Sequence, residues 1–87
     1  MQIEFDDAKD ERNQRLRGIS LALAAEFDFE EAIEVEQLVD GEQRFFALGP
    51  INGRIHALVY TLRGDTVRVI SLRKANKREV RRYEQFC

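Results

Sequence analysis

The sequence has 87 residues, of which 44% are hydrophobic and 34% charged, and its formal net charge is −2. A chain of this length and composition folds around one hydrophobic core, which excludes two domains and a disordered tail, so we predict a single domain over residues 1–87. The longest apolar run, residues 19–25, is shorter than the roughly 20 residues of a membrane span, and the acidic N-terminus lacks a secretory signal. We therefore expect a cytoplasmic protein with no membrane partner.

The first quarter of the chain predicts a short strand followed by two helices. Residues 3–5 alternate apolar and polar, as a short edge strand does. Asp6 and Asp7 then precede a helix over residues 8–16, where acids suit the positive end of the helix dipole, and Gly18 ends it. Ser20 can cap a second, short helix through Ala25.

The middle of the chain predicts an antiparallel meander. Residues 32–39 fit a strand or a helix extension, and we favour a strand with a highly charged edge. Asp40-Gly41 then makes a hairpin turn to a strand over residues 44–48. Residues 49–53 break the pattern before a strand at 54–62, and the turn at 63–65 leads to a strand at 66–72. Because residues 55–62 are apolar at nearly every position, that strand should be central.

The C-terminal segment predicts a capped helix from Lys77. Asn76 and Glu79 have the spacing of a capping box, and Val80, Tyr83 and Cys87 share a face that can pack on the sheet. The fold class is therefore α+β, a small antiparallel sheet of about four strands with two N-terminal helices and a C-terminal helix.

Charge divides the chain in two. Residues 1–42 contain 13 Asp/Glu and 4 Lys/Arg, a net charge of −9, whereas residues 43–87 contain 3 and 10, a net charge of +7. The basic half predicts a face for a polyanion, most simply RNA; a solvated helix face is the alternative. The candidate RNA-binding residues are Arg68, Lys74, Lys77, Arg78, Arg81 and Tyr83, the last because an aromatic ring among cations can stack on bases.

Other chemistries lack their motifs. No glycine-rich phosphate loop, His/Cys metal spacing or Ser-His-Asp set is present, so no metal or cofactor is expected. His56 lies within an apolar strand, where a structural, hydrogen-bonded imidazole is favoured over a general base. Cys87 is the only cysteine, which excludes an internal disulfide.

The ordered combination of three stretches resembles the BrnT family, toxins of type II toxin-antitoxin systems with a RelE-like ribonuclease fold. The first runs from Ile3 to Lys9 and continues at Asn13 and at residues 17–20; the second is Arg44-Phe45-Phe46-Ala47-Leu48-Gly49. The third begins at Gly53-Arg54, includes residues 59–65 and 67–75, and ends with Arg78-Glu79 and Tyr83-Glu84.

This resemblance implies a metal-independent ribonuclease that inhibits translation. It also implies a BrnA-like antitoxin with a ribbon-helix-helix part, through which the pair contacts operator DNA. The polar positions of the family pattern correspond in this chain to candidate catalytic residues, namely Arg44, Arg63, Arg73 and Glu79. Arginine suits stabilisation of a charged transition state, and Glu79 fits either a base or a helix cap.

One position departs from the family pattern. The family usually reads Lys-His-Gly after the first helix, where this chain has Leu16-Arg17-Gly18, so an arginine replaces a potential catalytic histidine. Two alternatives to an active nuclease therefore remain open, a non-catalytic RNA-binding module and an antitoxin-binding module with a decayed nuclease.

Overall fold

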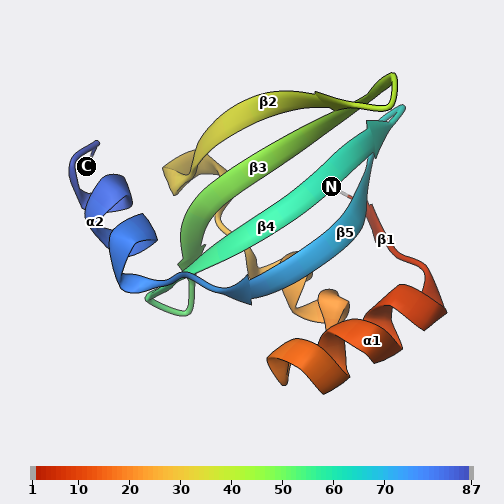
Figure 1. Ribbon diagram of the computed structural model, residues 1–87, viewed down its shortest axis with the longest axis horizontal. Helices are drawn as coiled ribbons and strands as arrows, with labels where there is room; N and C mark the ends of the chain where they lie inside the picture. The colour runs from red at the N-terminus through yellow and green to blue at the C-terminus, as the bar shows by residue number, and fades with distance from the viewer. Residues whose placement is uncertain (1, 87) are drawn as a thin grey trace.

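The computed structural model describes residues 2–86 and contains one five-stranded sheet with helices beside it and behind it (Figure 1). The strand order is β1-β5-β4-β3-β2, with β1 parallel to β5 and the other neighbours antiparallel. The strands are β1 (Gln2–Glu4), β2 (Ile33–Val39), β3 (Glu42–Ile51), β4 (Arg54–Arg63) and β5 (Thr66–Lys74). The helices are α1 (Asp7–Arg17), the 3-10 helices η1 (Leu21–Glu26) and η2 (Phe29–Glu31), and α2 (Lys77–Glu84). None of the described helices has the length and hydropathy of a membrane span.

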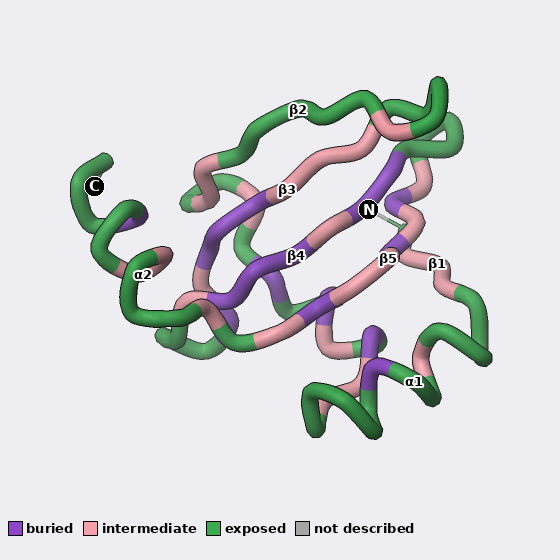
Figure 2. Tube along the Cα trace, viewed as in Figure 1, coloured by how far each residue is buried: buried purple, intermediate pink, exposed green. Residues whose placement is uncertain are grey.

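The two faces of the sheet are covered differently. The core face packs against η1 and η2, and Leu21, Leu58 and Leu72 in this layer are fully buried. The opposite face carries a smaller cluster, in which Tyr83 of α2 packs on Leu48 and Ala57 at one end of the sheet. Burial is therefore concentrated along β3, β4 and β5 (Figure 2).

Helix α1 lies along the edge of β5, past the end of the short strand β1. The side-chain amide of Asn13 bonds the backbone of Leu72 in both directions: Nδ2 donates to the Leu72 carbonyl (2.8 Å) and Oδ1 accepts from the Leu72 N–H (3.2 Å). Asn13 thus supplies the hydrogen bonds that a neighbouring strand would have made. This explains why a helix with a mostly exposed surface is nonetheless fixed in place.

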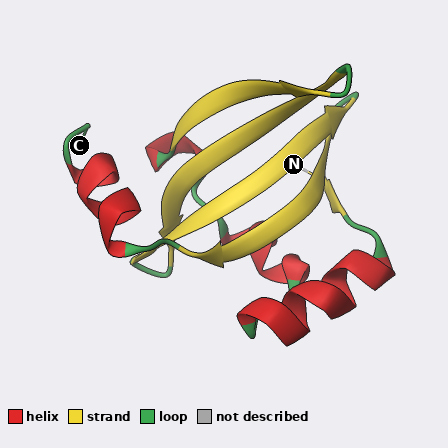
Figure 3. Ribbon diagram, in the orientation of Figure 1, coloured by secondary structure: helices red, strands yellow, loops and turns green. Residues whose placement is uncertain are grey.

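The predicted turns are confirmed at Asp40-Gly41 and at Gly64, where the backbone φ angles are positive. The predicted break at residues 49–53 is wrong in position, since β3 continues through Pro50 to Ile51 and the chain turns at Asn52-Gly53. Figure 3 shows the long strands of the sheet joined by short loops. Pro50 is tolerated because it lies beyond Leu48, the last residue of β3 that pairs with β2. The backbone of Pro50 faces away from β4, and its carbonyl accepts the Asp28 N–H (3.1 Å).

The remaining fold predictions are confirmed in type, with two differences of detail. The second N-terminal helix is of the 3-10 kind, capped by Ser20 as predicted, and the sheet gains a fifth strand because β1 joins β5 in parallel. Strand β4 is central as predicted, although Leu62 near its end is exposed. The capping box of α2 is present, and Cys87, expected on its packed face, lies outside the described residues.

Candidate nucleic-acid interface

Four predicted arginines share the sheet face opposite the core. We call this the cationic face, defined by Arg44, Arg63, Arg68 and Arg73 from strands β3, β4 and β5. Arg68 and Arg73 are five positions apart, which in a regular strand places side chains on opposite faces. A bulge in β5 changes this: Tyr60 pairs with Val69 and Val59 with Ser71, so the additional residue Ile70 brings both arginines to one face.

Three of these arginines are paired with a carboxylate. Arg44 contacts Glu42 (2.9 Å), Arg68 contacts Glu4 (3.4 Å), and Arg73 contacts Glu79 (2.7 Å). Among residues 2–86, Arg63 has no such ion pair, although its charge acts on Glu42. Each partner lowers the charge that the arginine presents to a ligand, so the residues with the freest charge must be sought nearby.

They lie on α1. A cleft of about 340 Å³ separates this helix from the cationic face, and we call it the α1 cleft; its lining is Lys9, Arg12, Asn13, Leu16, Arg17, Arg44, Ile70 and Ser71. It contains four cations and no carboxylate, and no described acid lies within ion-pair distance of Lys9, Arg12 or Arg17. The arrangement suits a phosphate, which arginine binds through a planar fork.

Sequence reasoning missed Lys9 and Arg12 because they belong to the acidic half of the chain. The signal was their spacing, since residues 9, 12, 13, 16 and 17 recur at helical intervals and share one face of α1. Asn13, in the middle of that face, attaches the helix to β5 and so directs the cations toward Arg44. Arg17 lines the same cleft.

Two of the carboxylates beside the arginines, Glu42 and Glu79, are poor proton acceptors because their pKa values are lowered. The Arg73 guanidinium, helped by the Asn76 N–H, lowers the pKa of Glu79, and in return Glu79 raises the pKa of Arg73. Hydrogen bonding to Arg44 likewise lowers the pKa of Glu42. Glu79 also accepts the Asn76 N–H (3.0 Å) in the capping box, so its oxygens are already engaged.

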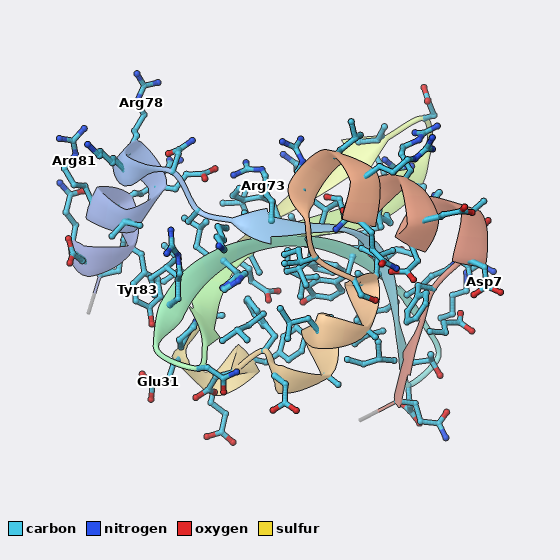
Figure 4. All side chains as sticks on the ribbon, turned by 90° about the horizontal axis from the view of Figure 1, so that it is seen from below. Asp7, Glu31, Arg73, Arg78, Arg81 and Tyr83 are labelled. Carbon is cyan, nitrogen blue, oxygen red and sulfur yellow. The ribbon has the colours of Figure 1, made fainter. Side chains whose placement is uncertain are left out.

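The remaining predicted RNA-binding residues do not gather around the cleft. Arg78 and Arg81 point outward from α2, while Arg73 lies between α2 and α1 (Figure 4). Lys77 is exposed on α2. Lys74 lies opposite His56 in the register of β4 with β5, on the other face of the sheet. Tyr83 is 9% exposed and donates its hydroxyl to the Glu31 carbonyl, a placement that favours packing over base stacking.

His56 has the structural role expected from its sequence context. It is 4% exposed, and its Nδ1 lies 2.8 Å from the Arg54 carbonyl. Across residues 2–86, no three His, Cys, Asp or Glu side chains gather where they could hold a metal ion.

Comparison with known proteins identifies one family. The model described as "Ribonuclease toxin, BrnT, of type II toxin-antitoxin system" matches residues 5–79 of the 87-residue chain. No curated protein matches the chain significantly. The matched range contains α1, the four strands β2 to β5 and the first turn of α2, and so includes the α1 cleft, whereas β1 precedes it.

Proposed function

Because the chain belongs to the BrnT family of ribonuclease toxins of type II toxin-antitoxin systems, we propose that it cleaves RNA at the α1 cleft without a metal ion, acts in the cytoplasm and inhibits translation. Its antitoxin partner is proposed to be BrnA-like, with a ribbon-helix-helix part through which the complex contacts operator DNA. The observation that carries the nuclease proposal is the gathering of Lys9, Arg12, Arg17 and Arg44 in one cleft.

The chemistry proposed for the cleft is electrostatic. In metal-independent cleavage the 2′-hydroxyl attacks its own 3′-phosphate, a bond from O2′ to phosphorus forms, and the bond to O5′ breaks. Negative charge grows on the phosphate oxygens in the transition state, where fixed arginines stabilise it. Arg44 and Arg17 would bind those oxygens from opposite sides of the cleft, with Arg63, Arg68 and Arg73 tracking the adjacent backbone.

Proton transfer is the weak element of this site. Arginine is too basic to exchange protons near neutral pH, Glu42 and Glu79 are stabilised as carboxylates, and His56 is buried away from the cleft. We therefore assign to solvent both the removal of the 2′-hydroxyl proton and the protonation of the departing O5′. Glu79, a candidate base by sequence, is better assigned to capping α2 and orienting Arg73.

A direct test uses protein purified free of antitoxin and incubated with total RNA at low salt. Cleavage products should appear with the wild type and fall at least tenfold with Arg44→Ala. Arg15→Ala is the matched control, because Arg15 is exposed on α1 and does not line the cleft. Absence of products at any protein concentration would contradict the proposal.

One observation favours a second candidate, a non-catalytic RNA-binding module. Arg17 stands where the family pattern has histidine, and three arginines of the cationic face are neutralised by carboxylates. Salt-sensitive RNA binding that depends on Arg44 but yields no product would select this candidate.

A further inference from the structure

Strand β2 leaves one long row of backbone groups unpaired. It is an edge strand of seven residues, and within residues 2–86 it pairs only with β3. The two-residue turn at Asp40-Gly41 makes Val39 and Glu42 the closing hydrogen-bonded pair, and such pairs recur at every second residue. The N–H and C=O groups of Glu34, Glu36 and Leu38 therefore point away from the sheet.

This edge lacks most of the devices that block strand pairing. Residues 33–39 contain no Lys and no Pro, and their register with β3 is uninterrupted. Figure 2 shows β2 exposed along most of its length, and Val35 and Leu38 are 55% and 76% exposed. At the other margin of the sheet, β1 and Asn13 cover β5. The edge of β2 is therefore available to another strand.

The chain segment that contains this edge carries charge of one sign; Arg82, which lines a cavity together with Glu34, comes from α2. From Glu26 to Gln43 the sequence contains eight acids and no Lys or Arg, and Glu34 and Glu36 lie on β2 itself. Such a surface repels RNA and attracts a basic segment. It is thus opposite in character to the α1 cleft.

An apolar groove adjoins the same strand. It has a volume of about 170 Å³ between β2 and α2, and its lining includes Val35, Phe46, Leu48 and Phe86. Phe86, which lines the groove, is 69% exposed, so a partner that fills the groove would bury apolar surface there. A cavity of about 150 Å³ already accommodates a benzene-sized group, so the groove has room for one aliphatic or aromatic side chain.

We propose that β2 accepts an extended, basic segment of the antitoxin as a sixth strand, with one apolar side chain of that segment in the groove. Backbone hydrogen bonds to Glu34, Glu36 and Leu38 would provide affinity, and lysine or arginine opposite the two glutamates would provide selectivity. The identity of the partner rests on the toxin-antitoxin membership stated above; the geometry of the edge does not depend on nuclease activity.

A second copy of the chain fits this edge poorly. Antiparallel self-pairing centred on β2 places Glu36 directly opposite its own copy, and a two-residue shift places Glu34 opposite Glu36. Like charges opposite one another destabilise a strand pair. A basic segment from another protein removes this repulsion.

The position of this surface also links binding to inhibition. Phe46 lines the groove, and Arg44 lines the α1 cleft two residues earlier on the same strand and face. A segment that occupies β2 and the groove would therefore end close to Arg44. We expect it to restrict access of RNA to the cleft.

The test compares three variants at Glu36, whose side chain is exposed. Glu36→Pro removes an outward N–H without removing a ladder hydrogen bond to β3, Glu36→Lys reverses the charge, and Glu36→Gln keeps the N–H and removes the charge. Glu34 is left unchanged because it accepts a part-buried hydrogen bond from the Tyr60 hydroxyl (2.8 Å), whereas the hydrogen bond that Glu36 accepts from Gln43 Nε2 is exposed. The probe is the purified protein encoded by the adjacent open reading frame, and calorimetry measures its Kd.

Glu36→Pro and Glu36→Lys should each raise Kd at least tenfold, and Glu36→Gln less, while RNA binding and cleavage stay as in the wild type. Hydrogen exchange in the complex should slow at Glu34, Glu36 and Leu38. An unchanged Kd in a folded Glu36→Pro variant would overturn the proposal. A wild-type protein that is a dimer, and that Glu36→Pro converts to a monomer, would also overturn it, because the edge would then bind a second copy of the chain. A protein without nuclease activity that still shows the Kd pattern would contradict only the proposed function.

Discussion

The guanidinium of Arg73, at the end of β5, and the carboxylate of Glu79, in the first turn of α2, meet through two parallel hydrogen bonds. Nη1 lies 2.7 Å from Oε1 and Nη2 lies 2.9 Å from Oε2. Since Glu79 also caps α2 through the Asn76 N–H, one carboxylate joins the cationic face to the helix that follows it. The pair therefore fixes the orientation of Arg73 as well as the start of α2.

Replacing Glu79 with Gln should lower the free energy of unfolding at pH 7 by about 1 kcal/mol, because the ion pair is lost while the capping position keeps a suitable residue. The pKa of Glu79 is lowered in the folded state, so its contribution is full above the ordinary glutamate pKa and is lost as pH falls through the folded value. Urea unfolding at pH 7 and pH 3 should show a smaller difference at the lower pH. Glu84→Gln, at an exposed position, is the control.

Replacing Asn13 with Ala should lower the free energy of unfolding by about 2–3 kcal/mol, because the N–H and C=O of Leu72 lose their partner in a buried setting. Thermal unfolding followed by circular dichroism should show a Tm lower by about 10 °C. Gln14→Ala, which removes one exposed hydrogen bond on the same helix, should change Tm little. Equal effects of the two variants would show that Asn13 does not attach α1 to the sheet.

Replacing Gly49 with Ala should cost about 1–3 kcal/mol through overpacking. A Cβ at this position would lie 2.7 Å from Phe27 Cζ and 2.9 Å from Ala32 Cβ, closer than such atoms approach. Replacing the Phe27 ring with the smaller leucine side chain in the same protein should recover part of the lost free energy of unfolding. Additive effects of the two substitutions in urea unfolding would contradict a direct clash between them.

RNA binding should weaken steeply with salt if phosphates occupy the α1 cleft. For a single strand, each phosphate contact contributes about 0.7 to the slope of log K against log salt. Arg44→Ala should therefore reduce the slope by about 0.7, and Arg15→Ala should leave it unchanged. Fluorescence anisotropy with a 2′-deoxy oligonucleotide measures binding without cleavage.

The rate of cleavage should rise with pH, by about tenfold per unit between pH 6 and 8. The described side chains that line the α1 cleft include arginines and one lysine but no histidine, and the pKa values of Glu42 and Glu79 beside the cationic face are lowered. No group there has the pKa of about 6.5 typical of histidine, so hydroxide limits the reaction. A bell-shaped profile with a limb near pH 6.5 would indicate a general base that this assignment omits.

Much of the fold followed from local chemistry in the sequence. Asp40-Gly41 and Gly64 set the turns because only residues tolerant of positive φ fit there, and Asn76 with Glu79 marked the start of α2 because their side chains satisfy the first N–H groups of the helix. The apolar run from Ile55 marked β4 as central, since only a strand covered on both faces loses its alternation. Such signals act within a few residues and need no tertiary context.

The candidate site depended on contacts between distant residues. The sequence determined that arginines gather in the second half, but alternation along β5 would have separated Arg68 from Arg73, and only the bulge at Ile70 returned them to one face. Likewise, the hydrogen bonds of Asn13 to Leu72, 59 residues away, brought Lys9, Arg12 and Arg17 from the acidic half to Arg44. Net charge is a property of composition, whereas a binding site requires charges to meet in space, and that meeting is decided by register and by the packing of α1 on β5.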